Sequence, residues 1–251
     1  MKGILLAAGY GNRLRPLSDL IPKCLIPING RPLLDIWLSK LFNSKEVDEV
    51  LVNTHYKNEL VNEFLINSSW SDRVTISYED ELLGTAGTIL KNKDFLNGED
   101  FFIAHADNLS SFDLKNFVEK FINSKSHITA TMMTFETTDP KSCGIIKQKN
   151  GIVTEFFEKS DEENGNLANA AIYIMNNKVI DIIERLNIDA PDISIHLLPK
   201  LIGKMNTFHN DEFHIDVGNI FNWNNANKTY IQTEAFLEKN QISWDKIIKN
   251  L

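Results

Sequence analysis

The sequence predicts an α/β fold with a mostly parallel sheet flanked by helices. Three observations carry this prediction. Short apolar runs alternate with segments of helical periodicity through the first half, the connections between them are short, and 43% of the 251 residues are hydrophobic, as in a globular protein. Strand–helix–strand alternation with short connections implies parallel pairing. The length exceeds the usual domain of about 100–150 residues, but a single large α/β domain still fits.

The first half sets out these elements in order. Strands are expected at 3–7, which is a short, continuous apolar run, and at 47–53, 74–78 and 101–105. Helices are expected where apolar side chains recur at helical spacing: 32–41, 60–65, 87–91 and 114–121. Pro32 suits a first helical turn because its missing N–H would have no partner there. Ligands of such sheets bind beyond the carboxyl ends of the strands. Four loops should therefore converge at one edge: 8–23, 53–58, 79–87 and 105–110.

The second half is less regular and indicates a smaller antiparallel extension. Its expected strands are 127–135, 144–147, 153–157 and 168–175. Helices are expected at 177–186 and 193–202, followed by a strand that reaches Asp216 and a helix through Phe236. No linker rich in Pro, Gly or Ser divides the chain, and no repeat is visible, so one domain over 1–251 is expected.

Charge and cysteine usage exclude several classes of partner. The net charge is −8, from 34 acidic and 26 basic residues, which argues against general binding to nucleic acid or an anionic membrane. The first apolar run breaks at Gly9, so no signal peptide is expected, and no apolar run reaches the ~18 residues of a membrane span. Cys24 and Cys143 match no zinc spacing and are expected to be free thiols. A cytoplasmic protein is expected.

The loop after the first strand has the composition of a phosphate-binding loop. Arg13, Arg15 and Lys23 add cations that can grip phosphate oxygens. Leu14 stands where the dinucleotide fingerprint has its third glycine, and no Gly-Lys-Ser/Thr follows, so neither that motif nor Walker A is present. The residues that let the backbone approach a ligand are small: Ala7, Ala8, Gly9 and Gly11.

Two linked motifs in this loop carry a family resemblance: Gly9-x-Gly11-x-Arg13-Leu14-x-Pro16-Leu17 and Pro22-Lys23-x-Leu25-x-Pro27. Together they resemble the signature of sugar-1-phosphate nucleotidylyltransferases, with Asn12 where that family usually has Thr. The resemblance implies a Rossmann-like domain, with a nucleotide-binding part at about 1–125 and a sugar-binding and C-terminal helical part at about 126–251. It implies catalytic roles for Arg13 and Lys23. It also implies nucleotide contacts from one stretch of the loop: Leu6, Ala7, Ala8, Gly9, Gly11 and Asn12.

The segment Tyr78–Gly87 resembles the family's base-binding segment, which implies nucleotide contacts from Glu79, Gly84, Thr85 and Gly87. A carboxylate at position 79 can accept from guanine N1–H and N2–H₂ together, or from uracil N3–H. The alternative for Glu79 is a solvated carboxylate at a strand end. GTP is favoured, because the segment resembles mannose and heptose 1-phosphate guanylyltransferases. UTP remains open, as in N-acetylmuramate 1-phosphate uridylyltransferases. None of the six histidines has metal spacing, and His55 is a candidate loop contact.

Further motifs resemble the family's metal and sugar sites. Asp107, in His105-Ala106-Asp107, and Asp216, in His214-Ile215-Asp216, match its two metal carboxylates, which implies Mg²⁺, a cation that prefers oxygen ligands. Binding of the sugar phosphate is implied for four residues: Gly144, Glu158, Lys159 and Asn169. Ala171 stands where Gly is common in the family.

The resemblance implies synthesis of an NDP-sugar and pyrophosphate from an NTP and a sugar 1-phosphate. The sugar could be a hexose, a heptose or an amino sugar. A role in cell-surface glycan synthesis, such as lipopolysaccharide or capsule, and a homodimer are further expectations from the family. The alternative of a different class is a non-catalytic nucleotide-sugar sensor subunit. Loss of Lys23 or of either aspartate would have favoured that class, and all three are present.

Overall fold

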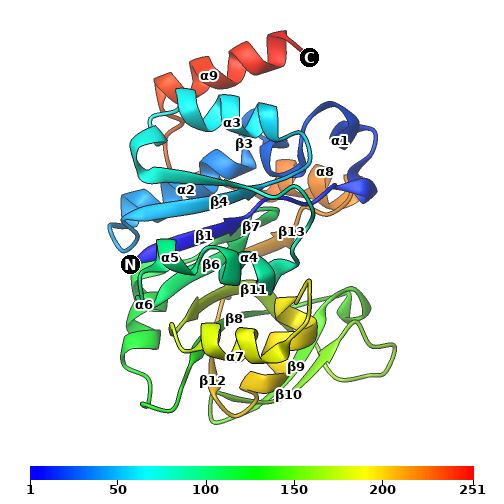
Figure 1. The fold of residues 1–251 in the computed structure, drawn as a ribbon. Coiled ribbons are helices and arrows are strands. Elements are labelled where there is room, and N and C mark those ends of the chain that lie inside the picture. Colours follow the sequence, from blue (N-terminus) through cyan, green and yellow to red (C-terminus); the bar gives the residue numbers. More distant parts are fainter. The chain divides into compact units, whose positions relative to one another are not determined.

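The computed structural model describes residues 1–251, which form two compact units (Figure 1). Unit 1 comprises Met1–Lys2, Leu83–Ala104 and Ser111–His214. Unit 2 comprises Gly3–Leu82, His105–Ser110 and Ile215–Leu251. Each unit is therefore built from three separate stretches of the chain.

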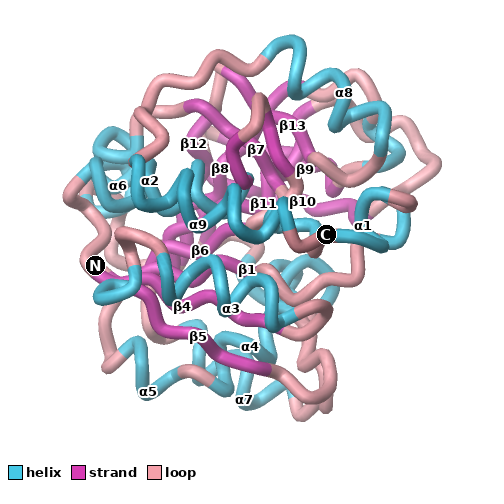
Figure 2. The backbone as a smooth tube through the Cα atoms, turned by 90° about the horizontal axis from the view of Figure 1, so that it is seen from above, coloured by secondary structure: helices cyan, strands magenta, loops and turns pink.

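Unit 2 contains a parallel layer of strands with helices packed on it. The strand order is β5 (Val74–Tyr78), β4 (Glu49–Thr54) and β1 (Lys2–Leu6), and β4 and β5 run parallel with Val50 opposite Val74. A short antiparallel pair, β2 (Pro27–Ile28) and β3 (Arg31–Pro32), precedes the first long helix. The helices are α1 (Leu17–Leu20), α2 (Leu33–Ser44), α3 (Asn58–Asn67), α8 (Ile220–Thr229) and α9 (Glu238–Lys249). Helices α3 and α9 are in contact, and Figure 2 shows them as neighbours.

The elements of unit 2 follow from local sequence. Strand β4 is buried from Val50 to Thr54, as expected for an apolar run that is covered on both faces. Helix α2 begins directly after Pro32 and ends at Ser44, and its C-cap, Lys45, adopts a left-handed conformation with φ of 64°. Nine of its twelve residues are buried, so the helix is buried on more than the single side that the sequence indicated.

Unit 1 contains a mostly antiparallel sheet, which confirms the predicted extension. The strand order is β6 (Phe101–His105), β11 (Leu167–Met175), β8 (Ala130–Glu136), β12 (Met205–His209), β10 (Ile152–Glu158) and β9 (Gly144–Lys149). Strands β8 and β12 run parallel, and the other neighbours run antiparallel. The helices are α4 (Thr85–Lys91), α5 (Lys93–Leu96), α6 (Leu114–Ile122) and α7 (Val179–Leu186). Phe117 of α6 packs edge-on against Phe102 and Phe112 in the core of this unit.

Two expectations for the second half were wrong in detail, and a third was confirmed. Residues 193–202 form a π turn and a 3₁₀ turn rather than an α-helix, because Pro199 has no N–H for the helical hydrogen bond. A strand does reach Asp216, as predicted: β13 (Phe213–Asp216) follows β12 after a turn in which Asn210 Nδ2 donates to Phe213 O at 3.0 Å. The helix predicted through Phe236 ends at Thr229, and α9 follows it.

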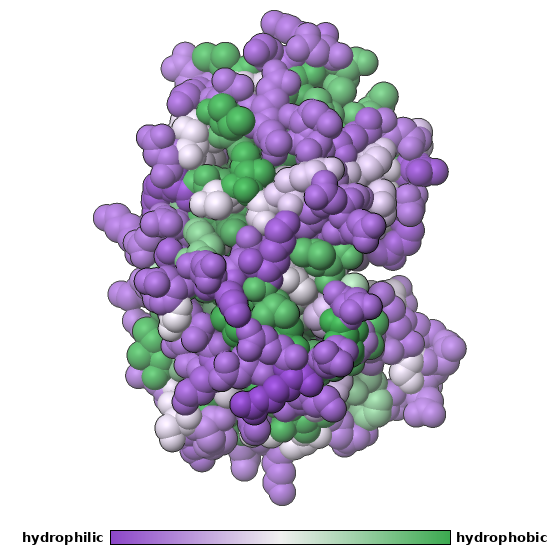
Figure 3. Space-filling view, in the orientation of Figure 1, coloured by the Kyte–Doolittle hydropathy of each residue, from purple (hydrophilic) through white to green (hydrophobic).

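The surface is mainly hydrophilic on the face drawn in Figure 3, where hydrophobic side chains form small, separate patches. No helix has both the length and the apolar character needed to cross a membrane. Cys24 and Cys143 are both free thiols, as expected, and burial raises the pKa of Cys24 to about 12. The Cys24 thiol is therefore protonated at neutral pH.

Candidate active site

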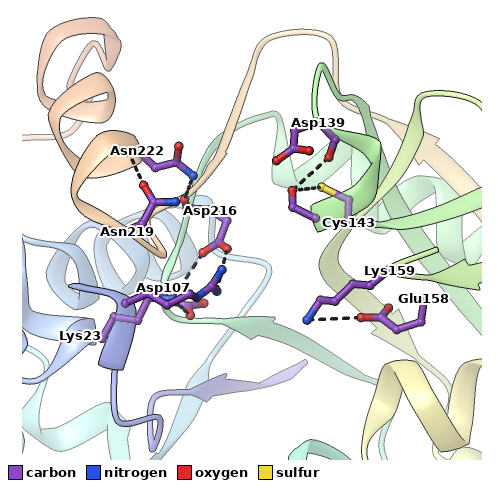
Figure 4. A network of polar contacts seen from close by, with 11 residues as sticks. Lys23, Asp107, Asp139, Cys143, Glu158, Lys159, Asp216, Asn219 and Asn222 are labelled. Carbon is purple, nitrogen blue, oxygen red and sulfur yellow. Dashed lines mark hydrogen bonds and ion pairs between the residues drawn. The ribbon is translucent and has the colours of Figure 1, made fainter. Parts of the chain in front are cut away.

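Lys23 lies between two carboxylates in unit 2. Its Nζ is paired with Asp107 Oδ2 and lies 3.4 Å from Asp216 Oδ1 (Figure 4). The Lys23 side chain is only 12% exposed, against 26% for Asp107 and 47% for Asp216. The buried neighbours Cys24 and Leu25 fix the 3₁₀ turn that carries the lysine. Lys23 precedes Asp107 by 84 positions and Asp216 by 193 positions in the sequence. The fold brings these three side chains together, as the motifs predicted.

The charges of this cluster support one another. Burial lowers the pKa of Lys23, but the charges of Asp107 and Asp216 outweigh that effect, so the pKa of Lys23 is raised. Burial raises the pKa of Asp107, but the charges of Lys23 and His105 and its hydrogen bonds outweigh it, so the pKa of Asp107 is lowered. Both Lys23 and Asp107 are therefore charged at neutral pH.

Three hydrogen bonds hold the two aspartates in place. Val217 N donates to Asp107 O at 3.0 Å, which ties the two aspartate segments together through the backbone. Trp37 Nε1 donates to the carbonyl of Asn108, the next residue after Asp107, at 2.6 Å. Asn222 Nδ2 donates to Asp216 O at 2.8 Å (Figure 4). None of these three supports was predicted from the sequence.

One of these supports had a signal in the sequence. Asn219 and Asn222 stand three residues apart at the start of α8, and Asn219 Oδ1 accepts from Asn222 N at 2.8 Å as an N-cap. That spacing marks a helix that starts at Ile220, four residues after Asp216. It places the Asn222 side chain, in the first helical turn, close to the Asp216 carbonyl.

The glycine loop closes against Lys23. Gly11 has φ of 67°, in the left-handed region that favours glycine, and a Cβ there would lie 3.2 Å from Lys23 Cβ. Gly9 has nothing within 4 Å of its Cβ position, so the loop is open at that point. Leu14 is buried and anchors the loop, whereas Arg13 is exposed. Arg13 Nη2 lies 3.8 Å from Asp216 Oδ2, so both predicted catalytic cations face the same carboxylate.

The loops after β1, β4 and β5 meet through side-chain hydrogen bonds. Ala7 N donates to Asn53 Oδ1 at 2.7 Å, and Asn53 Nδ2 donates to Glu79 Oε1 at 2.9 Å. Glu79 is 2% exposed, so the alternative of a solvated carboxylate is wrong; its contact with a base remains a prediction. His55 bonds to Glu79 O through Nδ1 at 2.8 Å and to the Tyr10 hydroxyl through Nε2 at 2.9 Å. His55 therefore contacts the loop, as predicted.

In unit 1 the start of α4, with Gly84 as its N-cap, packs closely against another loop. A Cβ on Gly84, which has φ of 75°, would lie 2.5 Å from Pro191 O. The same carbonyl accepts from two N–H groups in the first turn of α4, one of them that of Gly87 at 3.1 Å. Thr85 Oγ1 donates to Asp192 Oδ2 at 2.9 Å. Contact with Pro191 is therefore enough to require glycine at position 84, whether or not a nucleotide binds there.

The residues predicted to bind the sugar phosphate lie on three strands of unit 1 or, for Lys159, directly after one of them. Gly144 of β9 pairs with Glu158 of β10, and a Cβ on Gly144 would lie 2.8 Å from both Glu158 Oε2 and the Phe156 ring. Only glycine leaves room for that carboxylate. Lys159 Nζ lies 3.7 Å from Glu158 Oε1, with the lysine side chain 66% exposed (Figure 4). An exposed ammonium beside a held carboxylate suits a ligand with a phosphate and hydroxyl groups.

Strand β11 carries the fourth of these residues at an irregularity. Asn169 Nδ2 donates to the Tyr173 hydroxyl at 2.7 Å, and Asn169 Oδ1 accepts from Ala171 N at 3.0 Å. The register with β8 shifts between Asn169 and Tyr173. Ala171 has φ of 53°, a conformation that favours glycine. This explains why glycine is common at that position in the family, and it means that Ala171 adopts a strained conformation.

The two aspartates also fit a divalent metal ion. They bracket a cation, the Lys23 ammonium, and their oxygens are the hard ligands that Mg²⁺ prefers. No group of three or more His, Cys, Asp or Glu side chains gathers to hold a metal. A metal ion on this pair would therefore take its other ligands from substrate oxygens and water.

Comparison with known proteins places the chain in a family. Residues 2–233 match the nucleotidyl transferase family. Mannose-1-phosphate guanylyltransferase 1 of Arabidopsis thaliana is 34% identical over 192 residues, which are 73% of this chain and 52% of that protein. A mannose-1-phosphate guanyltransferase of Saccharomyces cerevisiae is 32% identical over 229 residues, 87% of this chain and 61% of that protein. The chain thus spans between half and two thirds of the length of these relatives.

Solved structures show the same fold. A protein from Bacillus anthracis assigned as a glucose-1-phosphate thymidylyltransferase superposes with a TM-score of 0.84 at 24% identity, covering 96% of this chain and 98% of that one. HddC from Yersinia pseudotuberculosis superposes with a TM-score of 0.76 at 24% identity, covering 92% and 99%. The predicted α/β class is confirmed. With the match of residues 2–233 and the gathered signature residues, the chain belongs to the nucleotidyl transferase family.

Proposed function

We propose that this chain transfers a nucleotidyl group from an NTP to a sugar 1-phosphate, with release of pyrophosphate. The observation that carries the proposal is the position of Lys23, held between Asp107 and Asp216 and packed against Gly11 of the glycine loop. This arrangement offers an ammonium and loop N–H groups to phosphates, and two carboxylates to a metal ion. It matches the needs of phosphoryl chemistry better than those of acyl transfer or redox chemistry.

The proposed reaction is a single in-line displacement. An oxygen of the sugar phosphate attacks the α-phosphorus, the bond from that phosphorus to the bridging β-oxygen breaks, and pyrophosphate leaves. No proton has to be removed, because the attacking phosphate is already anionic. Lys23 would bind the α-phosphate, and the exposed Arg13 would bind the phosphates that leave. Positioning and charge stabilisation would then supply the catalysis.

Members of this family generally use divalent metal ions. We assign Mg²⁺ to Asp107 and Asp216, where it would supply polarisation of the α-phosphate when bound. Lys159, with Glu158 beside it, would bind the phosphate and hydroxyls of the sugar, and Gly144 and Asn169 would shape that pocket. The NDP-sugar would serve as a cytoplasmic donor for cell-surface glycans.

The nucleotide that we favour is GTP, and mannose 1-phosphate is the first sugar to test. Similarity to mannose-1-phosphate guanylyltransferases supports both choices. Glu79 also supports guanine: its carboxylate accepts from Asn53, and a carboxylate offers about four acceptor positions in all. Within this class UTP is the runner-up.

The test is pyrophosphate release with Mg²⁺, offering GTP, UTP, TTP, CTP and ATP against a panel of sugar 1-phosphates. Release with GTP and one sugar supports the whole proposal, whereas release with UTP keeps the reaction and refutes the choice of base. Nucleotide binding without turnover on any sugar would favour a sensor subunit. Replacing Lys23 by alanine should lower kcat about 10²–10³-fold, by analogy with removal of a group that stabilises transition-state charge. Lys228→Ala, which removes an exposed lysine of the same unit, should not.

A further inference from the structure

A buried amide connects the start of the glycine loop with Glu79. Asn53, near the end of β4, is 4% exposed, and Ala7 and Glu79 follow β1 and β5 directly. The partners fix the orientation of the amide. The N–H of Ala7 can only donate, so it faces Oδ1, and the amide nitrogen is therefore left to donate to Glu79 Oε1. Asn53 therefore provides a hydrogen-bond acceptor for the N–H of Ala7 and a donor for the carboxyl group of Glu79.

Few other side chains could make both contacts. Aspartate would still accept from Ala7 but would place a second carboxylate against Glu79. Leucine would leave a buried N–H and a buried carboxylate oxygen without this partner, which is costly. Glutamine is one methylene longer in a site that is already packed. The site therefore requires a donor and an acceptor on one short side chain.

Further hydrogen bonds make this connection stiff. Glu79 N donates to Thr54 O at 2.8 Å, and Glu79 O bonds to His55 at 2.8 Å, so the backbone of Glu79 is held on two sides. Ala7 is the first residue after β1, and the glycine loop continues from it to Gly11. The direction of the loop at its start, and the position of the Glu79 carboxylate, are thus set by one amide.

We infer that Asn53 is a positioning residue for nucleotide selection. It holds the loop that would bind the triphosphate and the carboxylate that would meet the base in one fixed geometry. The inference rests on the proposed function for the identity of the ligand. It goes beyond that function in assigning base selection to a residue that belongs to none of the motifs.

Binding measurements separate the two contacts of Asn53 without requiring turnover. The probes are GTP, UTP and tripolyphosphate, each titrated with Mg²⁺ by calorimetry. Asn53→Asp keeps the acceptor for Ala7 but loses the donor to Glu79. It should weaken GTP by about 10- to 100-fold, the effect of losing a hydrogen bond to a charged group, and leave tripolyphosphate within about threefold. Asn67→Asp adds the same charge at an exposed position of unit 2 and should change neither affinity.

A second variant keeps the inference falsifiable if Asn53→Asp folds poorly. In Asn53→Asp/Glu79→Gln the amide and carboxylate exchange places, so the amide at position 79 can donate to the new carboxylate. This double variant should recover the melting temperature of the parent and keep its tripolyphosphate affinity, and its GTP-to-UTP preference should fall. The inference is overturned if Asn53→Asp weakens GTP and tripolyphosphate equally or leaves GTP unchanged. It also fails if the double variant does not recover. None of these outcomes depends on whether a sugar is ever nucleotidylated.

Discussion

Replacing Asn240 by alanine should destabilise unit 2 although the residue lies in the last helix. Asn240 is fully buried on α9, where its Nδ2 donates to Asp35 Oδ1 at 2.6 Å and its Oδ1 accepts from Ser69 N at 2.6 Å. The amide therefore joins α9 to α2, which carries Asp35, and to the turn after α3. Asp35 also accepts from Arg31 Nε at 2.6 Å and from Trp70 Nε1 at 2.9 Å.

The magnitude follows from what alanine leaves behind. Loss of a hydrogen bond to a charged acceptor costs about 1.5–3 kcal/mol, and Asp35 keeps two other donors, which favours the lower half of that range. The part-buried N–H of Ser69 loses its acceptor, which adds about 1 kcal/mol or more. The removed amide group also leaves a small cavity. Together these terms give about 3–4 kcal/mol.

Urea unfolding followed by tryptophan fluorescence measures this change, because Trp70 and Trp244 are buried on the elements concerned. Gln241→Ala is the matched control: the same helix, the next residue and an exposed side chain, with an expected change within about 0.5 kcal/mol. A change for Asn240→Ala that is no larger than that of the control would refute the assignment of α9 as part of the packed unit.

Three further predictions concern the site. Gly218→Ala should fold but lose about 10²-fold in kcat/KM, because its Cβ would lie 2.7 Å from Asp216 Oδ2 and displace that carboxylate; full activity would contradict the role of Asp216. Gly9→Ala should leave the melting temperature unchanged and weaken tripolyphosphate binding, because its Cβ meets only open space that a phosphate would fill; unchanged binding would remove Gly9 from the site. The lowered pKa of Asp107, paired with Lys23, stabilises the fold above the unfolded value of about 3.9, and this contribution is lost as pH falls through the lower folded pKa. In acid titrations followed by circular dichroism, the stability difference between the parent and Asp107→Asn should therefore be constant near neutrality and shrink only in acid, and a difference that grows in acid would contradict the ion pair.

The candidate site was predictable because its residues follow strands. Asp107 comes two residues after β6, and the glycine loop and Glu79 directly follow β1 and β5. Strand ends can be read from apolar runs, and parallel strands bring their carboxyl ends to one edge. The pairing of Lys23 with both aspartates needed the motif resemblance as well, because no local pattern relates positions 23, 107 and 216.

The C-terminal region was harder to predict because its buried face is partly polar. Asn240 and Ser243 are buried on α9 together with Trp244 and Ile247, so half of the buried face contains polar side chains. Hydrophobic periodicity is weak in such a helix, although the helix is packed. Arg31 is another buried polar side chain of this kind. It is 1% exposed, whereas an arginine is expected on the surface from its residue type alone.

Two supports of the site were not predictable for a related reason. Trp37 Nε1 and Asn53 each bond to a backbone atom that is distant in sequence, 71 and 46 positions away. A side chain that replaces a missing backbone partner leaves no periodic signal, because its spacing is set by the tertiary fold. Trp37 makes the point most directly. It would be counted as an apolar residue of α2, yet its indole N–H holds the carbonyl next to Asp107. Helix α2 is in turn tied to α9 through Asp35 and Asn240. Helix α9, the element farthest in sequence from the N-terminal signature, therefore belongs to the framework that fixes the Asp107 segment. Deletion of α9 should weaken metal binding at the proposed site as well as lower stability.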